Sequence, residues 1–299
     1  MYLTGYLKLL ERAGNRMLTI NKLLGFHGLD MSKSIKIARH QDTRGVDVHE
    51  LLAKNEFNLY QSYQEKNQFK DCDFIVSCLG IENNQALFIG VYEVNGVHRV
   101  DGFPSDYEVS FKGKAKVNSQ YRYDLEKVLG FEDLEKRLVI RWNNVAQAWC
   151  MKIDTNEKEV VQLLPRGYVR DFPDYLEVNI FYSEMKAIIE DPDANGVWHK
   201  MLSSVAAVYL IVDTTDGMQY VGSASGKQGL LGRWKQYAKN EHGDNKKLIE
   251  LLKNDPERVY NFRYTILRTL PNTLTRNEII KEEYKYMNKL GSKSHGLNN

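Results

Sequence analysis

Hydrophobic and polar positions in the last third of the chain predict alternating strands and helices. Three short runs of apolar and β-branched residues are predicted strands: 207–213, 218–222 and 262–267. The turn-forming residues Thr214 to Gly217 separate the first two runs, which predicts a hairpin. Three segments are predicted helices: 230–239, 245–253 and 275–290. In the last helix, Thr275 and Glu278 have the spacing of a capping box.

The first two thirds of the chain contain more strand patterns. The predicted strands are residues 74–79, 87–94, 137–142 and 176–181, and the predicted helices are 6–11, 48–54 and 183–190. Asn95-Gly96 is typical of a tight turn after the second of these strands. The segment Asp191 to Gly196 is rich in turn formers and predicts a joint. We therefore expect an α+β protein of two domains, residues 1–191 and 197–299.

Composition places the chain among globular proteins. It has 299 residues, of which 42% are hydrophobic and 27% charged. No apolar run approaches the ~18 residues of a membrane span, and the N-terminal residues lack the pattern of a secretory signal. The three cysteines are an odd number without ligand-spaced partners, which argues against a disulfide framework or a zinc site. These features favour a cytoplasmic protein that does not bind membranes.

Charge is unevenly distributed along the chain. The whole chain carries a formal net charge of +2, whereas residues 200–299 carry +6 and residues 1–199 carry −4. A polyanion partner for the last third and an ordinary solvated basic surface are both compatible with this distribution.

Two tyrosines and a glycine mark the predicted hairpin. Because side chains alternate between the faces of a sheet, Tyr209 and Tyr220 share a face when the loop has an even number of residues. We favour a loop centred near Thr214-Thr215, since this register places the two tyrosines opposite each other. Gly222 would let a phosphate or another backbone approach closely.

The predicted helices carry an arginine and a carboxylate in unusual positions. Arg233 and Tyr237 are four residues apart and share a helix face. Glu283 falls inside an apolar stripe that includes Ile280 and Met287, whereas Glu282 lies on the polar side. A carboxylate on a core-facing stripe is costly unless it is paired or bound to a metal. Glu283 is therefore the candidate metal ligand.

Together these residues resemble the GIY-YIG nuclease superfamily. Ala207-Val208-Tyr209 precedes Tyr220-Val221-Gly222 by ten residues, as in the two-strand signature of the family, and Gly232 to Tyr237 is similar to its arginine helix. Glu283 precedes Asn298 by fifteen residues, which is also similar to the family's ending. The resemblance covers about residues 205–299 and implies a small, mainly antiparallel three-stranded sheet flanked by helices. Ala207-Val208 replaces the usual Gly-Ile, and some members carry His at the position of Tyr237.

The resemblance implies hydrolysis of a DNA phosphodiester with one divalent metal, Mg²⁺ or Mn²⁺. Glu283 would hold the metal, because Mg²⁺ prefers oxygen ligands. Arg233 would bind the scissile phosphate with its planar fork. Tyr209 would accept the proton of the attacking water, while Tyr220 and Tyr237 would orient water or phosphate.

Two further residues complete the candidate site. Asn298 would fix the local geometry by hydrogen bonds. His242 would contact the phosphate; the alternative is a loop histidine that caps the next helix.

The first domain is expected to recognise DNA. The strand at 87–94 together with Trp142 and Trp149 resembles PUA-like barrels that read bases, including modified ones, in some restriction enzymes. This resemblance implies stacking of a base on Trp142 or Trp149, whereas a core role for these aromatic residues is the alternative. Arg39-His40-Gln41-Asp42 is interpreted as a surface or structural turn rather than a catalytic group.

The sequence thus favours a restriction or anti-phage endonuclease acting on double-stranded DNA. The alternatives are a homing or repair nuclease and a non-catalytic DNA-binding module on a decayed nuclease fold. We favour an enzyme because Arg233, Glu283 and both signature tyrosines are present. The sequence leaves open whether the protein acts as a monomer or a homodimer.

Overall fold

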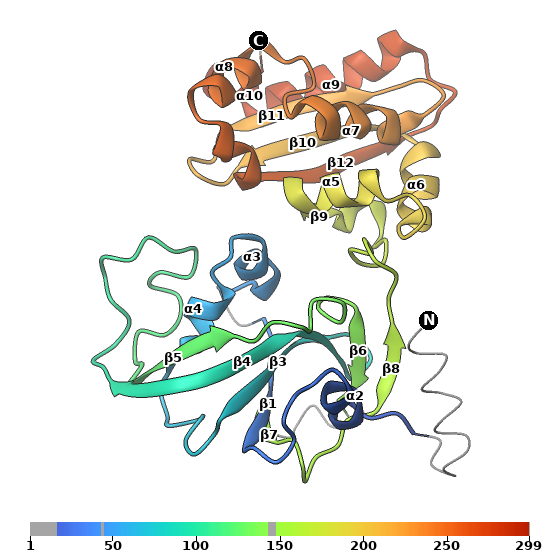
Figure 1. Cartoon of the computed structure of the whole chain (residues 1–299). Coiled ribbons are helices and arrows are strands. Elements are labelled where there is room, and N and C mark those ends of the chain that lie inside the picture. Colours follow the sequence, from blue (N-terminus) through green and yellow to red (C-terminus); the bar gives the residue numbers. More distant parts are fainter. Residues whose placement is uncertain (1–16, 43–44, 143–147, 299) are drawn as a thin grey trace. The chain divides into compact units, whose positions relative to one another are not determined.

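The computed structural model describes residues 17–42, 45–142 and 148–298 (Figure 1). The chain divides into two compact units, Met1–Leu164 and Pro165–Asn299. The helix predicted at residues 6–11 lies outside the described residues. Within the described ranges, no helix combines the length and apolar character needed to cross a membrane.

The second unit is built on a four-stranded antiparallel sheet. Its strands are β9 (Asn179–Phe181), β10 (Ala206–Asp213), β11 (Gln219–Ala224) and β12 (Phe262–Leu270). Their order is β11-β10-β12-β9, so β11 is an edge strand. The three strands of the resemblance are therefore present, and β9 adds a fourth at the opposite edge. The segment predicted as a strand at 176–181 forms β9 only at its end, after the 3₁₀ turn η1 (Tyr175–Glu177).

The division between the units lies earlier in the chain than the predicted joint at Asp191 to Gly196. Phe181 in β9 pairs with Arg263 in β12, which commits this part of the chain to the second unit. Trp198 donates a 2.7 Å hydrogen bond from its ring nitrogen to the Arg170 carbonyl, which anchors the preceding segment as well. Turn residues within a domain look like a linker in the sequence because both need the same backbone conformations.

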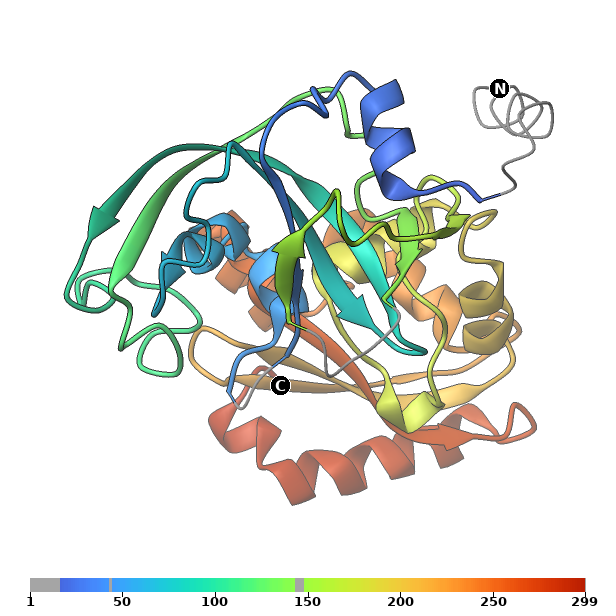
Figure 2. The same ribbon diagram turned by 90° about the horizontal axis from the view of Figure 1, so that it is seen from below.

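Helices cover both faces of this sheet (Figures 1 and 2). One face packs against α5 (Tyr182–Glu190), α6 (Gly196–Ser203), α7 (Gly229–Asn240) and α8 (Lys246–Asn254), and its core includes Tyr209, Trp234 and Tyr264. The other face packs against α9 (Arg276–Leu290) through Val208, Val221 and Met287. Alternate side chains of β10 and β11 thus pack into two separate hydrophobic cores, one on each face of the sheet.

Local sequence signals set the ends of α9. The Thr275 side chain accepts from the Glu278 backbone, and the Glu278 side chain accepts from the Thr275 backbone, which forms the predicted capping box. Gly291 ends the helix with φ of 64°, a left-handed conformation that glycine adopts without steric cost. The short helix α10 (Ser292–His295) and the last described residues follow.

The first unit contains one branched, eight-stranded mixed sheet. Its path is β2 (Tyr63–Gln64), β5 (Tyr121–Lys127), β4 (Gln85–Arg99), β3 (Phe74–Ile81), β1 (Ile35–His40) and β7 (Cys150–Lys152). A branch from β4 carries β6 (Leu138–Arg141) and β8 (Val160–Leu163). The helices are α2 (Ile20–Phe26), α3 (Val48–Ala53) and α4 (Phe57–Ser62), so the predicted helix at 48–54 is present. Only β1 and β3 pair in parallel among the described strands.

The PUA-like barrel is not confirmed. No pairing among the described strands joins β7 to β2 or β8, so the sheet stays open. The turn predicted at Asn95-Gly96 is wrong, because β4 continues to Arg99 and a bulge between Val94 and Gly96 absorbs these residues. Cys72, Cys78 and Cys150 are all buried and free, in agreement with the absence of a disulfide framework.

Candidate active site

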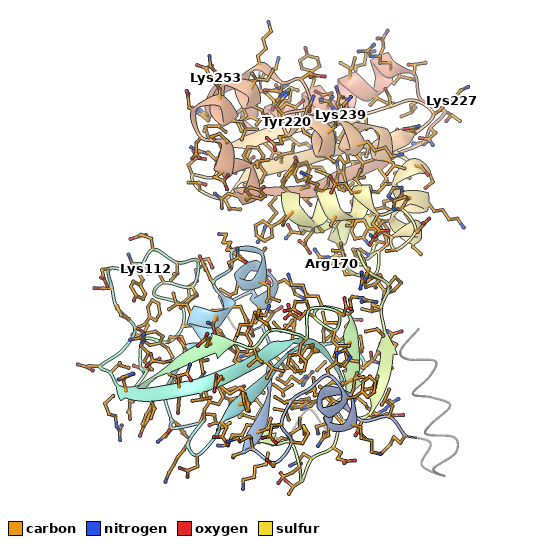
Figure 3. All side chains as sticks on the ribbon, in the orientation of Figure 1. Lys112, Arg170, Tyr220, Lys227, Lys239 and Lys253 are labelled. Atoms are coloured by element: carbon orange, nitrogen blue, oxygen red, sulfur yellow. The ribbon has the colours of Figure 1, made fainter. Side chains whose placement is uncertain are left out.

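A cleft of about 590 Å³ lies along the edge strand β11. Tyr220 on one face of the strand and Ser223 on the other both line this cleft. Arg233 enters it from α7 and Glu283 from α9, which pack on opposite faces of the sheet. Tyr220 is labelled on this unit in Figure 3. Because the cleft lies at an edge, side chains from both faces of the sheet meet there.

Three of the predicted residues form one hydrogen-bonded cluster. Arg233 donates from Nε to the Tyr209 hydroxyl at 3.0 Å and from Nη2 to the Tyr237 hydroxyl at 3.3 Å. The two hydroxyls are themselves 3.1 Å apart. The Tyr220 ring centre lies 6.4 Å from that of Tyr209, so the fourth predicted residue joins the same group. The helical spacing of Arg233 and Tyr237 thus brings both onto the face of α7 that meets β10 and β11.

The hairpin register differs from the favoured one. Tyr209 lies opposite Gly222, and Tyr220 lies opposite Ile211, so the two tyrosines share a face as diagonal neighbours. A Cβ atom at Gly222 would stand 2.4 Å from the Tyr209 hydroxyl oxygen. Gly222 therefore makes room for the Tyr209 side chain, rather than for a backbone or a phosphate. A bulge in the pairing of β10 with β12 also lies between Val208 and Tyr209.

Burial sets the protonation of the tyrosine pair. Tyr209 and Tyr237 are 0% exposed. Burial raises the pKa of Tyr209 and the neighbouring Tyr220 adds to this, whereas the Arg233 charge and the hydrogen bonds act in the opposite direction. Burial likewise raises the pKa of Tyr237 well above its usual value. Both phenols therefore keep their protons at neutral pH.

Glu283 is held at the cleft by a serine that the sequence did not single out. Ser223 donates from its hydroxyl to the Glu283 carboxylate. Burial raises the pKa of Glu283 above its ordinary value, while Ser223 and the charges of Arg233 and Lys293 lower it by less. Glu282, one residue away, instead accepts from Arg268 at 2.8 Å and from Lys285 at 2.5 Å. The two carboxylates therefore point into different environments, as the apolar stripe indicated.

Asn298 closes part of the edge of β11. Its side-chain amide accepts from the Val221 N–H and donates to the Val221 carbonyl, both at 2.8 Å. The Leu297 N–H also donates to the Gln219 carbonyl at 2.8 Å. The last residues thus pair with the first half of β11 as a further strand would. The second half of this edge borders the cleft.

His242 takes a local role in the structure. Its Nδ1 accepts a 3.0 Å hydrogen bond from the Asp244 backbone N–H, and it is not among the residues that line the cleft. This arrangement fits the expectation of a loop histidine with a local backbone partner better than the expectation of a phosphate contact.

The two tryptophans of the first unit differ in accessibility. Trp142 is 1% exposed, packs in the core, and has the Lys158 ammonium 4.8 Å from its ring centre. The prediction that a base stacks on Trp142 is therefore wrong for this conformation, because no ring face is free. Trp149 is 36% exposed and lines a cavity of its own unit.

Several residues of the cleft were missed by the sequence reasoning. Gln236 accepts from Arg233 Nη1 at 2.6 Å and donates to Asp244, which extends the network away from the cleft. Arg276 and Lys293 line the cleft near Glu283. Arg276 precedes Glu283 by seven residues, and this helical spacing is the signal that would have placed both on one face.

A metal at this site would have few protein ligands. The described residues contain no group of three or more His, Cys, Asp or Glu side chains that could hold an ion. Glu283 supplies one carboxylate and Ser223 one hydroxyl, both at the cleft. This donor set fits Mg²⁺, which keeps several waters and binds through one or two carboxylates together with substrate phosphates.

Part of the chain is similar to two solved structures. The catalytic domain of the homing endonuclease I-TevI is 26% identical to the matched part, with a TM-score of 0.26. That match covers 31% of this chain and 96% of the other. A mutant of the catalytic domain of the intron endonuclease I-TevI gives the same identity and TM-score and is covered over 92%. No family model and no curated protein matches the chain.

Proposed function

We propose that the second unit is a metal-dependent endonuclease of the GIY-YIG type that hydrolyses phosphodiester bonds in double-stranded DNA. One observation carries the proposal: Arg233, Tyr220 and Glu283 come from three separate elements and line a single cleft at the edge of β11. A cation, a phenol and a carboxylate in one cleft are the groups that phosphate hydrolysis requires.

Arg233 is arranged to bind the scissile phosphate. A guanidinium carries five N–H groups. Tyr209, Tyr237 and Gln236 accept three of them, and these bonds fix the plane of the side chain. One hydrogen on Nη1 and one on Nη2 have no acceptor among the described residues. These two can be donated to phosphate oxygens as charge accumulates in the transition state.

The tyrosines divide into one that lines the cleft and a pair with no exposed surface. Tyr220 is 8% exposed and lines the cleft, so it is the tyrosine that the attacking water or the phosphate can contact. Tyr209 is wholly buried and its pKa is raised, which disfavours the proton transfer implied by the resemblance. We propose that Tyr209 and Tyr237 orient Arg233 and that Tyr220 orients the water or the phosphate.

Glu283 and Ser223 are the residues that would hold a divalent metal. When bound, Mg²⁺ or Mn²⁺ would neutralise charge on the phosphate and the leaving oxygen. Glu283 contributes a charged oxygen ligand, and Ser223 orients that carboxylate through its hydroxyl.

The biological role is proposed to be restriction or defence against phage. Residues 200–299 of the second unit, which carry a net charge of +6, would supply attraction to the DNA backbone, while the first unit would select the target. A homing or repair nuclease and a non-catalytic DNA-binding module are the alternatives. The hydrogen-bonded Arg233 and the carboxylate of Glu283 favour an enzyme over a non-catalytic module.

Cleavage of DNA by the purified full chain tests the proposal. Modified and unmodified DNA are incubated with Mg²⁺, with Mn²⁺, or with a chelator, and the ends of any products are sequenced. We expect metal-dependent cuts at defined positions. DNA that is bound but stays intact under every condition would support the non-catalytic module instead.

Replacing Glu283 by Gln is expected to stabilise the metal-free protein. Burial raises the folded-state pKa of Glu283, so its protonated form contributes stability that is fully present below the unfolded pKa and is lost as pH rises through the folded-state pKa. At pH 7 the charged, partly buried carboxylate is therefore a net cost to the folded state. The neutral variant removes this cost, and we expect its Tm at pH 7 to rise by about 1–3 °C. Mg²⁺ should raise the Tm of the wild type but not of this variant.

Calorimetry with and without Mg²⁺ measures both effects. Glu282→Gln is the matched control, since Glu282 pairs with Arg268 and Lys285, and it should retain the response to Mg²⁺. A Glu283→Gln variant that melts earlier than the wild type and still responds to Mg²⁺ would contradict the assignment of Glu283.

A further inference from the structure

The first unit contains a cavity of about 570 Å³ at the end of β1, a size usual for small-molecule sites. Arg39 and His40, the last two residues of β1, line it. The sequence interpretation of these residues as a surface or structural turn is wrong, because both are buried. Tyr60 from α4, Lys116 from the loop before β5 and Trp149 from the segment before β7 also line this cavity.

Three rings and one ammonium group surround this cavity. The His40 ring centre lies 5.5 Å from that of Trp149 and 6.3 Å from that of Tyr60, so His40 neighbours both rings. The Lys116 ammonium stands 4.2 Å from the centre of the Tyr60 ring. The cavity therefore combines aromatic faces with a cation at one wall.

One buried polar atom at this cavity has no partner. His40 is 6% exposed, and its Nε2 makes no hydrogen bond within the described part of the chain. Buried polar groups without partners cost free energy, and few are found in native proteins. A bound ligand with a polar atom would satisfy it.

Charge in the cavity favours an anionic or acceptor-rich ligand. Burial and the Lys116 charge lower the pKa of His40 to about 3, so the imidazole is neutral at physiological pH. Burial lowers the pKa of Lys116 to about 8, and nearby Glu65 only partly offsets this. An anionic ligand beside Lys116 would favour its charged form.

We propose that this cavity binds a single nucleotide, with its base against Trp149 and its phosphate near Lys116. Every base has a π face that stacks on aromatic side chains, and the carboxamide of Gln68 at the cavity can pair with a base edge. The source of this nucleotide rests on the proposed DNA nuclease function: it would be a nucleotide of the DNA substrate whose base is displaced from the duplex. A free mononucleotide offers the same chemistry.

Binding to the full chain in the presence of a chelator tests the cavity without cleavage. The probes are a short duplex with one unpaired 2-aminopurine, the same duplex fully paired, and 2-aminopurine deoxynucleoside monophosphate. We expect the wild type to prefer the unpaired duplex over the paired one. Trp149→Ala should weaken binding of the unpaired duplex by at least about fivefold.

Two lysines of one loop provide a matched comparison. Lys116→Gln should weaken binding of the unpaired duplex, whereas Lys112→Gln should not. Lys112 pairs with Glu108 at 2.6 Å, does not line the cavity, and is labelled in Figure 3. The two variants could instead weaken binding of the mononucleotide and leave binding of both duplexes unchanged. That result would support the cavity and identify a free nucleotide as its ligand.

The result that overturns the proposal is unchanged binding of all three probes by Trp149→Ala and Lys116→Gln. If Trp149→Ala fails to fold, photo-crosslinking of wild-type protein to a duplex with an unpaired 5-iodouracil replaces it. Crosslinks at Trp149, Tyr60 or His40 support the cavity, and crosslinks only elsewhere overturn it. Failure of the nuclease proposal is seen separately, as absent metal-dependent cleavage with nucleotide binding retained.

Discussion

Glu283→Ala is expected to abolish metal-dependent DNA cleavage, with a loss of about three orders of magnitude or more in rate. Glu283 is the one acidic side chain that lines the cleft among the described residues, so its removal leaves no carboxylate for the metal. DNA binding should remain within about twofold, because phosphate contacts from basic side chains supply most of that affinity. Single-turnover cleavage and equilibrium binding measured on the same duplex separate the two effects.

Glu282→Ala is the control for this prediction. Glu282 lies next to Glu283 in the chain but forms ion pairs with Arg268 and Lys285, and it does not line the cleft. Exposed ion pairs contribute little to stability, so this variant should cleave at close to the wild-type rate. If Glu282→Ala eliminates cleavage and Glu283→Ala does not, the assignment of the metal ligand is wrong.

Local signals in the sequence predicted the elements of the second unit well. The capping box at Thr275 and the helical spacing of Arg233 and Tyr237 depend on residues three or four positions apart. Such contacts form within one helix and need no knowledge of distant partners. The position of Glu283 on an apolar stripe was readable for the same reason.

The register of the hairpin could not be derived from turn residues alone. Thr214 to Gly217 permit several loop lengths, and each changes which residue faces Tyr209. The structure selects the register that places Tyr209 against Gly222, where the missing side chain accommodates the phenol. The register is therefore set by a contact between the strands, in which the large side chain of Tyr209 occupies the space left by Gly222.

The first unit shows a second limit of sequence reasoning. Trp142 and Trp149 are close in sequence and of the same type, yet one is in the core and the other lines a cavity. Their surroundings come from segments distant in the chain, such as Arg39 and Lys158 over the ring of Trp142. Arg39 and His40 were misjudged because polar residues are seldom buried, whereas both are buried here at the end of β1.

Arg233→Lys is expected to lower the cleavage rate by at least about two orders of magnitude, the effect of removing one electrostatic stabiliser of a transition state. Lysine keeps the positive charge but has a single ammonium group in place of the planar fork. It cannot donate to Tyr209, Tyr237 and Gln236 and still present two hydrogens to a phosphate. The loss should therefore appear in the rate of cleavage at saturating DNA more than in binding.

Arg268→Lys is the matched control, because Arg268 lies on β12, pairs with Glu282 and does not line the cleft. We expect this variant to cleave DNA at close to the wild-type rate. Single-turnover rates for both variants, together with melting temperatures to confirm folding, make the comparison. Near-normal cleavage by Arg233→Lys would mean that charge alone suffices at this position. The hydrogen bonds from Arg233 to Tyr209, Tyr237 and Gln236 would then serve the packing of α7 against the sheet rather than the orientation of a catalytic fork.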